Sequence, residues 1–73
     1  MSTAAPQLEI RLNGEACQVA AGATVADLVR QLDLPEDRVA IELDGRVIRR
    51  PRWGDAKLGT GARVEIVQLV GGG

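Results

Sequence analysis

The sequence predicts an α+β fold in which a single helix packs on one face of a small mixed sheet. Three observations support this: apolar alternation over residues 8–12, an apolar helical stripe over residues 25–32, and renewed alternation over residues 39–43 and 63–70. A period of two is typical of half-buried strands, and a period near 3.6 is typical of an amphipathic helix. The elements follow the order ββαββ, and we expect four to five strands in the sheet.

The first third of the chain predicts a β-hairpin. Residues 8–12 place Leu and Ile side chains on one face of a strand. Asn13-Gly14 follows, and this dipeptide favours the positive φ angles that a type I′ turn requires at both central positions. Residues 15–20 form the returning strand, in which Cys17 and Val19 share a face.

A helix is predicted to begin at Thr24. The Thr24 hydroxyl can accept the amide N–H of Asp27, whose carboxylate also favours the positive end of the helix dipole. Pro35 should end the helix near Asp33 or Leu34. Four residues form a single apolar stripe, and they are Val25, Leu28, Val29 and Leu32.

Two short strands and an irregular segment follow. Residues 39–43 alternate again, Asp44-Gly45 is a second tight-turn signal, and residues 46–48 form a short partner strand. Glycine and proline interrupt residues 49–63, so we expect turns there and one short 3₁₀ segment. The residues of the first strand that should face inward are Val39, Ile41 and Leu43.

The last strand, residues 63–70, presents two different faces. Val64 and Ile66 should face the core, while Val67 and Leu69 have the opposite parity. Apolar residues that point away from a core suggest a docking patch for a partner. The alternative is that another loop or helix of the same chain covers them.

Length and composition limit the possible functions. Seventy-three residues make one domain, which we place at residues 8–70, between a lead-in of residues 1–7 and a glycine tail of residues 71–73. The net charge of −1 gives no electrostatic footprint for nucleic acid or membrane. The absence of histidine excludes Ser-His-Asp and Cys-His catalysis by this chain and removes a usual ligand of zinc or iron. Because the start of the chain resembles no signal peptide and no apolar run would span a bilayer, we expect a soluble cytoplasmic protein.

Several residues could have a functional role, but a structural role is the simpler interpretation of each. Cys17 shares parity with core residues and should be a buried structural thiol. Trp53 should cap the edge of the core rather than form a ligand platform. Arg49, Arg50 and Arg52 flank a proline and are expected to form a solvated face, although such a group could also steer an acidic partner.

The chain ends in Val70-Gly71-Gly72-Gly73. Composition alone leaves two interpretations equally open. One is a frayed terminus, and the other is a thin arm that carries a terminal carboxylate into a partner's active site. Three extended residues reach about 10 Å. The strand that leads directly into the glycines favours the second interpretation.

These features together resemble a known family. The segment from Asn13 to Leu32, the stretch Val47-Ile48-Arg49-Arg50-Pro51-Arg52-Trp53 and the terminal glycines resemble the ThiS-family sulfur carriers, which have a ubiquitin-like β-grasp fold. The similarity runs from Leu8 to Gly73. The chain departs from many relatives at Thr60-Gly61-Ala62, where they carry Asp-Gly-Asp, and at Arg49, where they often carry proline.

The resemblance implies that the chain is a protein co-substrate and not an enzyme. An E1-like (ThiF-like) enzyme would use ATP to adenylate the Gly73 carboxylate, while the chain itself binds no cofactor or metal. Sulfur from a cysteine desulfurase would then give a thiocarboxylate, and a thiazole synthase (ThiG-like) would take that sulfur. Gly72 and Gly71 would let the tail thread into a narrow channel, Val67 and Leu69 would dock the partner, and the free chain would be a monomer.

Two alternatives remain at this point. The small subunit of molybdopterin synthase, or another sulfur-metabolite carrier, would use the same tail chemistry with a different sulfur acceptor. A non-covalent ubiquitin-like interaction module would have an inert tail.

Overall fold

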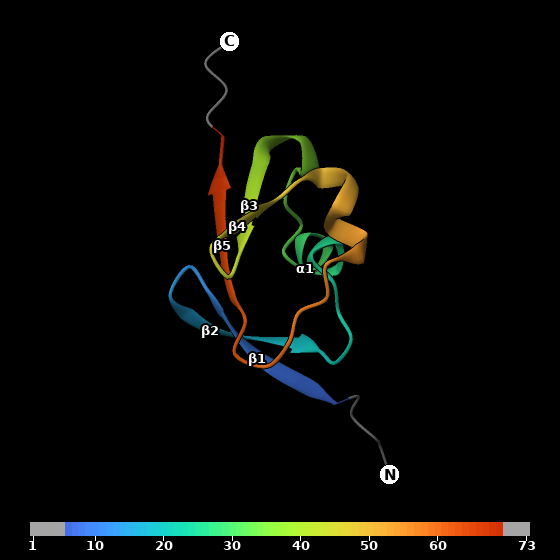
Figure 1. The fold of residues 1–73 in the computed structure, drawn as a ribbon, viewed down its shortest axis with the longest axis vertical. Coiled ribbons are helices and arrows are strands. Elements are labelled where there is room, and N and C mark those ends of the chain that lie inside the picture. The colour runs from blue at the N-terminus through green and yellow to red at the C-terminus, as the bar shows by residue number, and fades with distance from the viewer. Residues whose placement is uncertain (1–5, 70–73) are drawn as a thin grey trace.

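A computed structural model describes residues 6–69 and shows one sheet with one α-helix packed on it (Figure 1). The elements in chain order are β1 (Gln7–Leu12), β2 (Glu15–Ala20), α1 (Val25–Gln31), the 3₁₀ helix η1 (Glu36–Arg38), β3 (Val39–Leu43), β4 (Arg46–Ile48), the 3₁₀ helix η2 (Arg50–Asp55) and β5 (Arg63–Gln68). The predicted mixed sheet with a single helix is confirmed. The sheet has five strands, so the full order is ββαβββ.

The strand order in the sheet is β2-β1-β5-β3-β4. Strand β5 pairs parallel with β1 and antiparallel with β3, while the two hairpins are antiparallel. The last strand of the chain is therefore also the central strand of the sheet. Its parallel pairing with β1 covers only Arg11↔Arg63 and Leu12↔Val64, so β5 runs on beyond the end of β1.

Both predicted tight turns are confirmed by their backbone angles. Asn13 and Gly14 have φ angles of 49° and 85°, and Asp44 and Gly45 have φ angles of 51° and 86°. Positive φ at both central positions is the mark of a type I′ turn, whose twist matches that of the flanking strands.

Helix α1 begins with the predicted capping box, now complete in both directions. The Thr24 Oγ1 accepts the amide of Asp27 at 3.2 Å, and the Thr24 amide donates to Asp27 Oδ2 at 2.9 Å. A third bond runs from the Thr24 hydroxyl to Asp27 Oδ2 at 3.1 Å. The shorter Asp thus performs the reciprocal role for which Glu is the preferred residue.

The helix ends earlier than the predicted end at Asp33 or Leu34. Its last residue is Gln31, and Asp33 has a φ of 54°. The amide of Asp33 donates to Arg30 O and that of Leu34 donates to Val29 O, each at 3.1 Å. This is a Schellman motif with aspartate where glycine is usual, and it ends the helix before the steric effect of Pro35 is needed.

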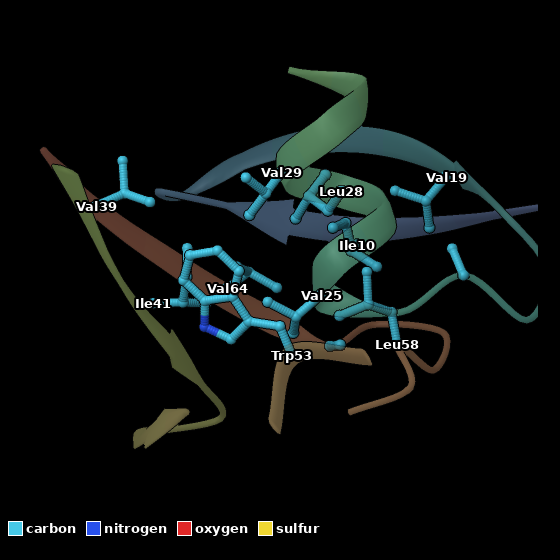
Figure 2. Packing of buried hydrophobic residues seen from close by; sticks show 12 residues of the cluster. Ile10, Val19, Val25, Leu28, Val29, Val39, Ile41, Trp53, Leu58 and Val64 are labelled. Carbon is cyan, nitrogen blue, oxygen red and sulfur yellow. The ribbon is translucent and has the colours of Figure 1, made fainter. Parts of the chain in front are cut away.

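The core lies between α1, η2 and the inner face of the sheet, which we define as the face covered by α1 (Figure 2). Trp53 is only 3% exposed, so the prediction that it caps the edge of the core is wrong. Its indole N–H donates to Ile48 O at 2.9 Å, and this bond allows the ring to be buried without an unsatisfied donor. The fully or nearly fully buried residues are Ile10, Val19, Ala23, Val25, Leu28, Val29, Val39, Ile41, Trp53, Leu58, Ala62 and Val64.

Candidate functional site

The candidate site is the end of β5, from which the chain continues into its last four residues. Predicted tail residues Gly71, Gly72 and Gly73 lie outside the described residues. Leu69 is described, and its amide donates to Arg38 O at 2.6 Å. The ladder between β3 and β5 therefore extends one residue past Gln68, and β5 is fixed in direction up to Leu69.

On its other side, β5 is held by the side chain of Asn13. The Ile66 amide donates to Asn13 Oδ1 at 2.7 Å, and Asn13 Nδ2 donates to Ile66 O at 3.1 Å. The Asn13 amide also donates to Val64 O at 2.8 Å. Asn13 thus continues with its side chain the pairing that β1 ends, and it links two points 53 residues apart.

Sequence reasoning identified Asn13 as a turn residue and missed this second role. A type I′ turn needs only positive φ, which glycine supplies equally well. The only signal for this second role in the sequence was the presence of asparagine rather than glycine at position 13. The contact itself depends on the β1–β5 pairing, which the sequence does not specify directly.

The predicted docking residues lie where expected. Val67 is 56% exposed and Leu69 is 53% exposed, both on the outer face of the sheet, opposite α1. No described loop or helix covers them, so within residues 6–69 the alternative interpretation is wrong. Sequence reasoning missed Val47, which is 67% exposed and is the third large apolar side chain on the described surface.

The outer-face residues form neighbouring pairs across the strands. Val67 lies opposite Ala40, and Val47 lies opposite Glu42 on the other side of β3. The register therefore places Val47 diagonally beside the Ala40–Val67 pair. We call Ala40, Val47, Val67 and Leu69 the apolar patch.

Cys17 lies against the core, and the three arginines lie on the surface. Cys17 is half-buried and packs against the core, as predicted for a structural thiol, although its burial is incomplete. Arg49, Arg50 and Arg52 are exposed, and Arg52 makes one loose ion pair with Asp55 at 3.6 Å. Arg49 and Arg50 line a groove of about 400 Å³ beside β4.

Within residues 6–69 no group of three or more Cys, Asp or Glu residues is placed to hold a metal ion. The same part of the chain contains no helix of the length and hydropathy needed to cross a membrane. One carboxylate there has a clearly shifted pKa. Hydrogen bonds from the Thr24 backbone, from Arg30 and from the Thr24 hydroxyl lower the pKa of Asp27 below its ordinary value of 3.8, and this group belongs to the helix cap.

Comparison with known proteins defines the family. The model of the ThiS family matches residues 10–73. The chain belongs to the ThiS family. The sulfur carrier protein ThiS of Escherichia coli strain K12 is 30% identical over 66 residues, which cover 90% of this chain and all of that protein. The predicted family, the ThiS sulfur carriers of thiamine biosynthesis, is thereby confirmed.

Solved structures agree with this ThiS-family assignment. The crystal structure of the thiamine biosynthesis protein ThiS from Geobacter metallireducens has a TM-score of 0.78 and 28% identity, over 90% of this chain and all of that chain. Its solution NMR structure has a TM-score of 0.76 and the same identity, over 90% and 88% of the two chains. The β-grasp fold predicted from the resemblance is confirmed.

A second relative of this ThiS-family chain is much longer. A thiazole synthase from Magnetococcus marinus is 33% identical over 66 residues, covering 90% of this chain but only 20% of that protein. The chain thus spans about one fifth of that relative's length. A stretch similar to this chain therefore occurs inside a protein named for thiazole synthesis.

Proposed function

We propose that this chain carries sulfur on its C-terminus. In this proposal the Gly73 carboxylate attacks ATP within an E1-like enzyme, which forms an acyl-adenylate and releases pyrophosphate. The terminal sulfur of a cysteine persulfide then displaces AMP and forms an acyl disulfide. A thiolate cleaves that S–S bond, leaving the thiocarboxylate on Gly73 and a disulfide on the other product.

The observation that carries the proposal is the anchoring of β5. Its last described residues are hydrogen-bonded to Arg38, the residue before β3, on one side and to Asn13 on the other, at 2.6–3.1 Å. In the sequence, three glycines follow Val70. This arrangement, in a chain of the ThiS family, supports delivery of the terminus from a fixed direction into a partner's site.

The chemistry requires a separate activating enzyme. A terminal carboxyl group has a reference pKa of roughly 3.3–3.7, so it is ionised at neutral pH and is a poor electrophile. The sequence has no histidine to act as a base. We therefore assign the chain the role of a sulfur carrier rather than a catalyst, with ATP consumed by the partner.

Docking is assigned to the apolar patch, with Val67 and Leu69 nearest to the tail. Exposed apolar side chains that lie together on a sheet are typical of an interaction surface. An apolar contact beside the exit of the tail would hold the partner while Gly71, Gly72 and Gly73 enter its channel.

Thiazole synthase is the proposed sulfur acceptor. The Magnetococcus marinus thiazole synthase contains a stretch similar to this chain, which supports a shared pathway for the two kinds of protein. Delivery to a pterin precursor would use the same tail chemistry, and acceptor proteins tested in parallel would distinguish the two.

Mass spectrometry tests the carrier function directly. The chain is incubated with ATP, a cysteine desulfurase, cysteine and the adenylating enzyme encoded in the same genome. A mass gain equal to the replacement of one oxygen by sulfur at Gly73 is expected. No gain with an enzyme that modifies its own cognate carrier would instead support a non-covalent interaction module.

Gly73→Ala sharpens this test. A methyl group on the terminal residue should collide with a channel shaped for bare backbone, so we expect adenylation slowed by at least about tenfold. Pyrophosphate release measures the rate, and Gly59→Ala, at an exposed position far from the tail with open space around it, serves as the control. Equal rates for Gly73→Ala and the parent chain would contradict the narrow-channel argument.

A further inference from the structure

The outer face of the sheet places like charges directly opposite one another. Glu42 on β3 faces Glu65 on β5, and Arg11 on β1 faces Arg63 on β5. All four belong to the face opposite α1, because their neighbours along each strand point into the core. Like charges directly opposite each other in a sheet destabilise the fold.

No ion pair among residues 6–69 compensates these four charges. The two ion pairs there join Arg30 to Asp27 and Arg52 to Asp55. Asp44 lies beside Arg63, but its Oδ1 accepts the Arg63 backbone amide at 2.9 Å. The free chain therefore retains an arrangement that costs stability.

The charges continue directly into the apolar patch. Along β5 the outward residues are Arg63, Glu65 and Val67, roughly 7 Å apart along the strand. Each has a matching neighbour on the adjacent strand, namely Arg11, Glu42 and Ala40. Along β5 the face is thus divided into a basic, an acidic and an apolar band, with the apolar band nearest to the tail, and Val47 on β4 flanks the acidic band.

The basic and acidic bands border a hollow in the surface. A depression of about 580 Å³ is lined by Arg11, Arg63, Glu65 and Val67 together with the Asn13-Gly14 turn. The side chains of Arg11, Arg63, Glu65 and Val67 beside it are exposed, so a partner's side chains could enter without rearrangement of the sheet. The depression touches both residues of the basic band and one residue each of the acidic and apolar bands.

We infer that this face docks on thiazole synthase in a single orientation through its three bands. The partner presents an acidic side chain to Arg11 and Arg63, a lysine or arginine to Glu42 and Glu65, and an apolar surface to the apolar patch. Each charge on the partner meets an opposite charge on this face and so relieves a like-charge repulsion. The order of the three bands fixes the orientation of the complex and so directs the tail toward the partner's active site. This inference rests on the proposed sulfur acceptor.

Two charge reversals test the bands. Glu65→Lys and Arg11→Glu each turn a like-charge pair into an opposite-charge pair, so both should raise the thermal midpoint of the chain by about 1–4 °C. Both should also weaken binding to the thiazole synthase of the same genome by at least about tenfold. Calorimetric titration of the full chain with its ordinary carboxylate measures binding without any sulfur transfer.

Glu15→Lys is the matched control. Glu15 is exposed and lies opposite Leu12, with the parity of the inner face, at the end of the hairpin. It undergoes the same charge change as Glu65 and should leave affinity within about twofold, because its side chain has the parity of the opposite face of the sheet. Opposite signs for stability and affinity at Glu65 and Arg11 would separate a binding role from a structural one.

Three results would overturn the inference. If both reversals bind as tightly as the parent chain, the bands take no part in docking, while the proposed function stands. If the parent chain gains sulfur but does not bind thiazole synthase, the acceptor assignment fails with the inference. If sedimentation shows a dimer that Glu65→Lys dissociates, the face belongs to a second copy of the chain.

Discussion

The two faces of the sheet follow opposite rules. The buried residues beneath the inner face are aliphatic apart from Trp53, and no buried side-chain polar atom among the described residues lacks a hydrogen-bond partner. The outer face carries like-charge pairs and three exposed valine or leucine side chains. Both faces are built from the same strands, so backbone pairing does not explain the difference.

The inner face of the sheet therefore provides stability, and the outer face is free to serve binding. A domain of this size buries only around 60% of its unfolded surface, so its stability margin is small. Unfavourable pairs at Glu42–Glu65 and Arg11–Arg63 are tolerated because the core and the caps compensate for them. Substitutions on the two faces should therefore affect different properties.

The largest expected effect is the loss of a core side chain. Leu28 is fully buried in α1, and Leu28→Ala should lower the free energy of unfolding by about 2–5 kcal/mol. Val67→Ala, on the outer face, should change it by less than about 0.5 kcal/mol. Urea denaturation of both variants measures the contrast, and similar losses would contradict the division between the faces.

A substitution on the outer face should affect binding rather than stability. Val67→Asp should leave the unfolding free energy within about 0.5 kcal/mol of the parent while weakening association with the adenylating enzyme. The substitution removes the apolar contact, and the new carboxylate must also lose its hydration water in the interface. Unchanged affinity would remove Val67 from the docking surface.

An intermediate effect is expected at the contact that joins the hairpin to β5. Asn13→Gly keeps the positive φ of the turn but removes both side-chain bonds to Ile66, so stability should fall by about 1–2 kcal/mol. Hydrogen exchange at the Ile66 amide should accelerate more than at the amide of residue 13, which retains its bond to the Val64 carbonyl. Asp44→Gly, which removes a single bond at the equivalent turn, is the control and should cost less.

The fold was largely predictable because its elements depend on local chemistry. Asn13-Gly14, Asp44-Gly45 and Thr24 each specify backbone geometry within four residues, and alternation specifies the inner face of the strands longer than β4. The early end of α1 and the burial of Trp53 were not predicted. The first depends on Asp33 adopting a conformation more usual for glycine, and the second on a bond to Ile48 that only the folded chain brings into place.

The candidate site was predictable to a lesser degree. Parity alone placed Val67 and Leu69 on the exposed face. Val47 was missed because β4 has only three residues, too few for alternation to be read. The like-charge pairs depend on the register between β5 and its neighbours, and register across 22 or more residues of intervening chain has no local signal.

A smaller effect is expected at the helix cap. Thr24→Ala removes the hydroxyl that accepts the Asp27 amide and should cost about 1 kcal/mol. Thr24→Ser retains the hydroxyl and should recover most of that loss. Thermal unfolding of both variants measures the difference, and equal midpoints for the two would show that the cap contributes nothing.

The smallest expected effect is the acid dependence of that same cap. Folding lowers the pKa of Asp27 below 3.8, so this carboxyl group binds fewer protons in the folded chain than in the unfolded chain. Its stabilising contribution is therefore fully present above pH 3.8. The contribution is lost as the pH falls through the lowered pKa. The stability difference between the parent and Asp27→Asn should therefore be constant near neutral pH and shrink as the pH falls through the lowered pKa. A parent–Asp27→Asn difference independent of pH would assign the effect to hydrogen-bond geometry rather than to charge.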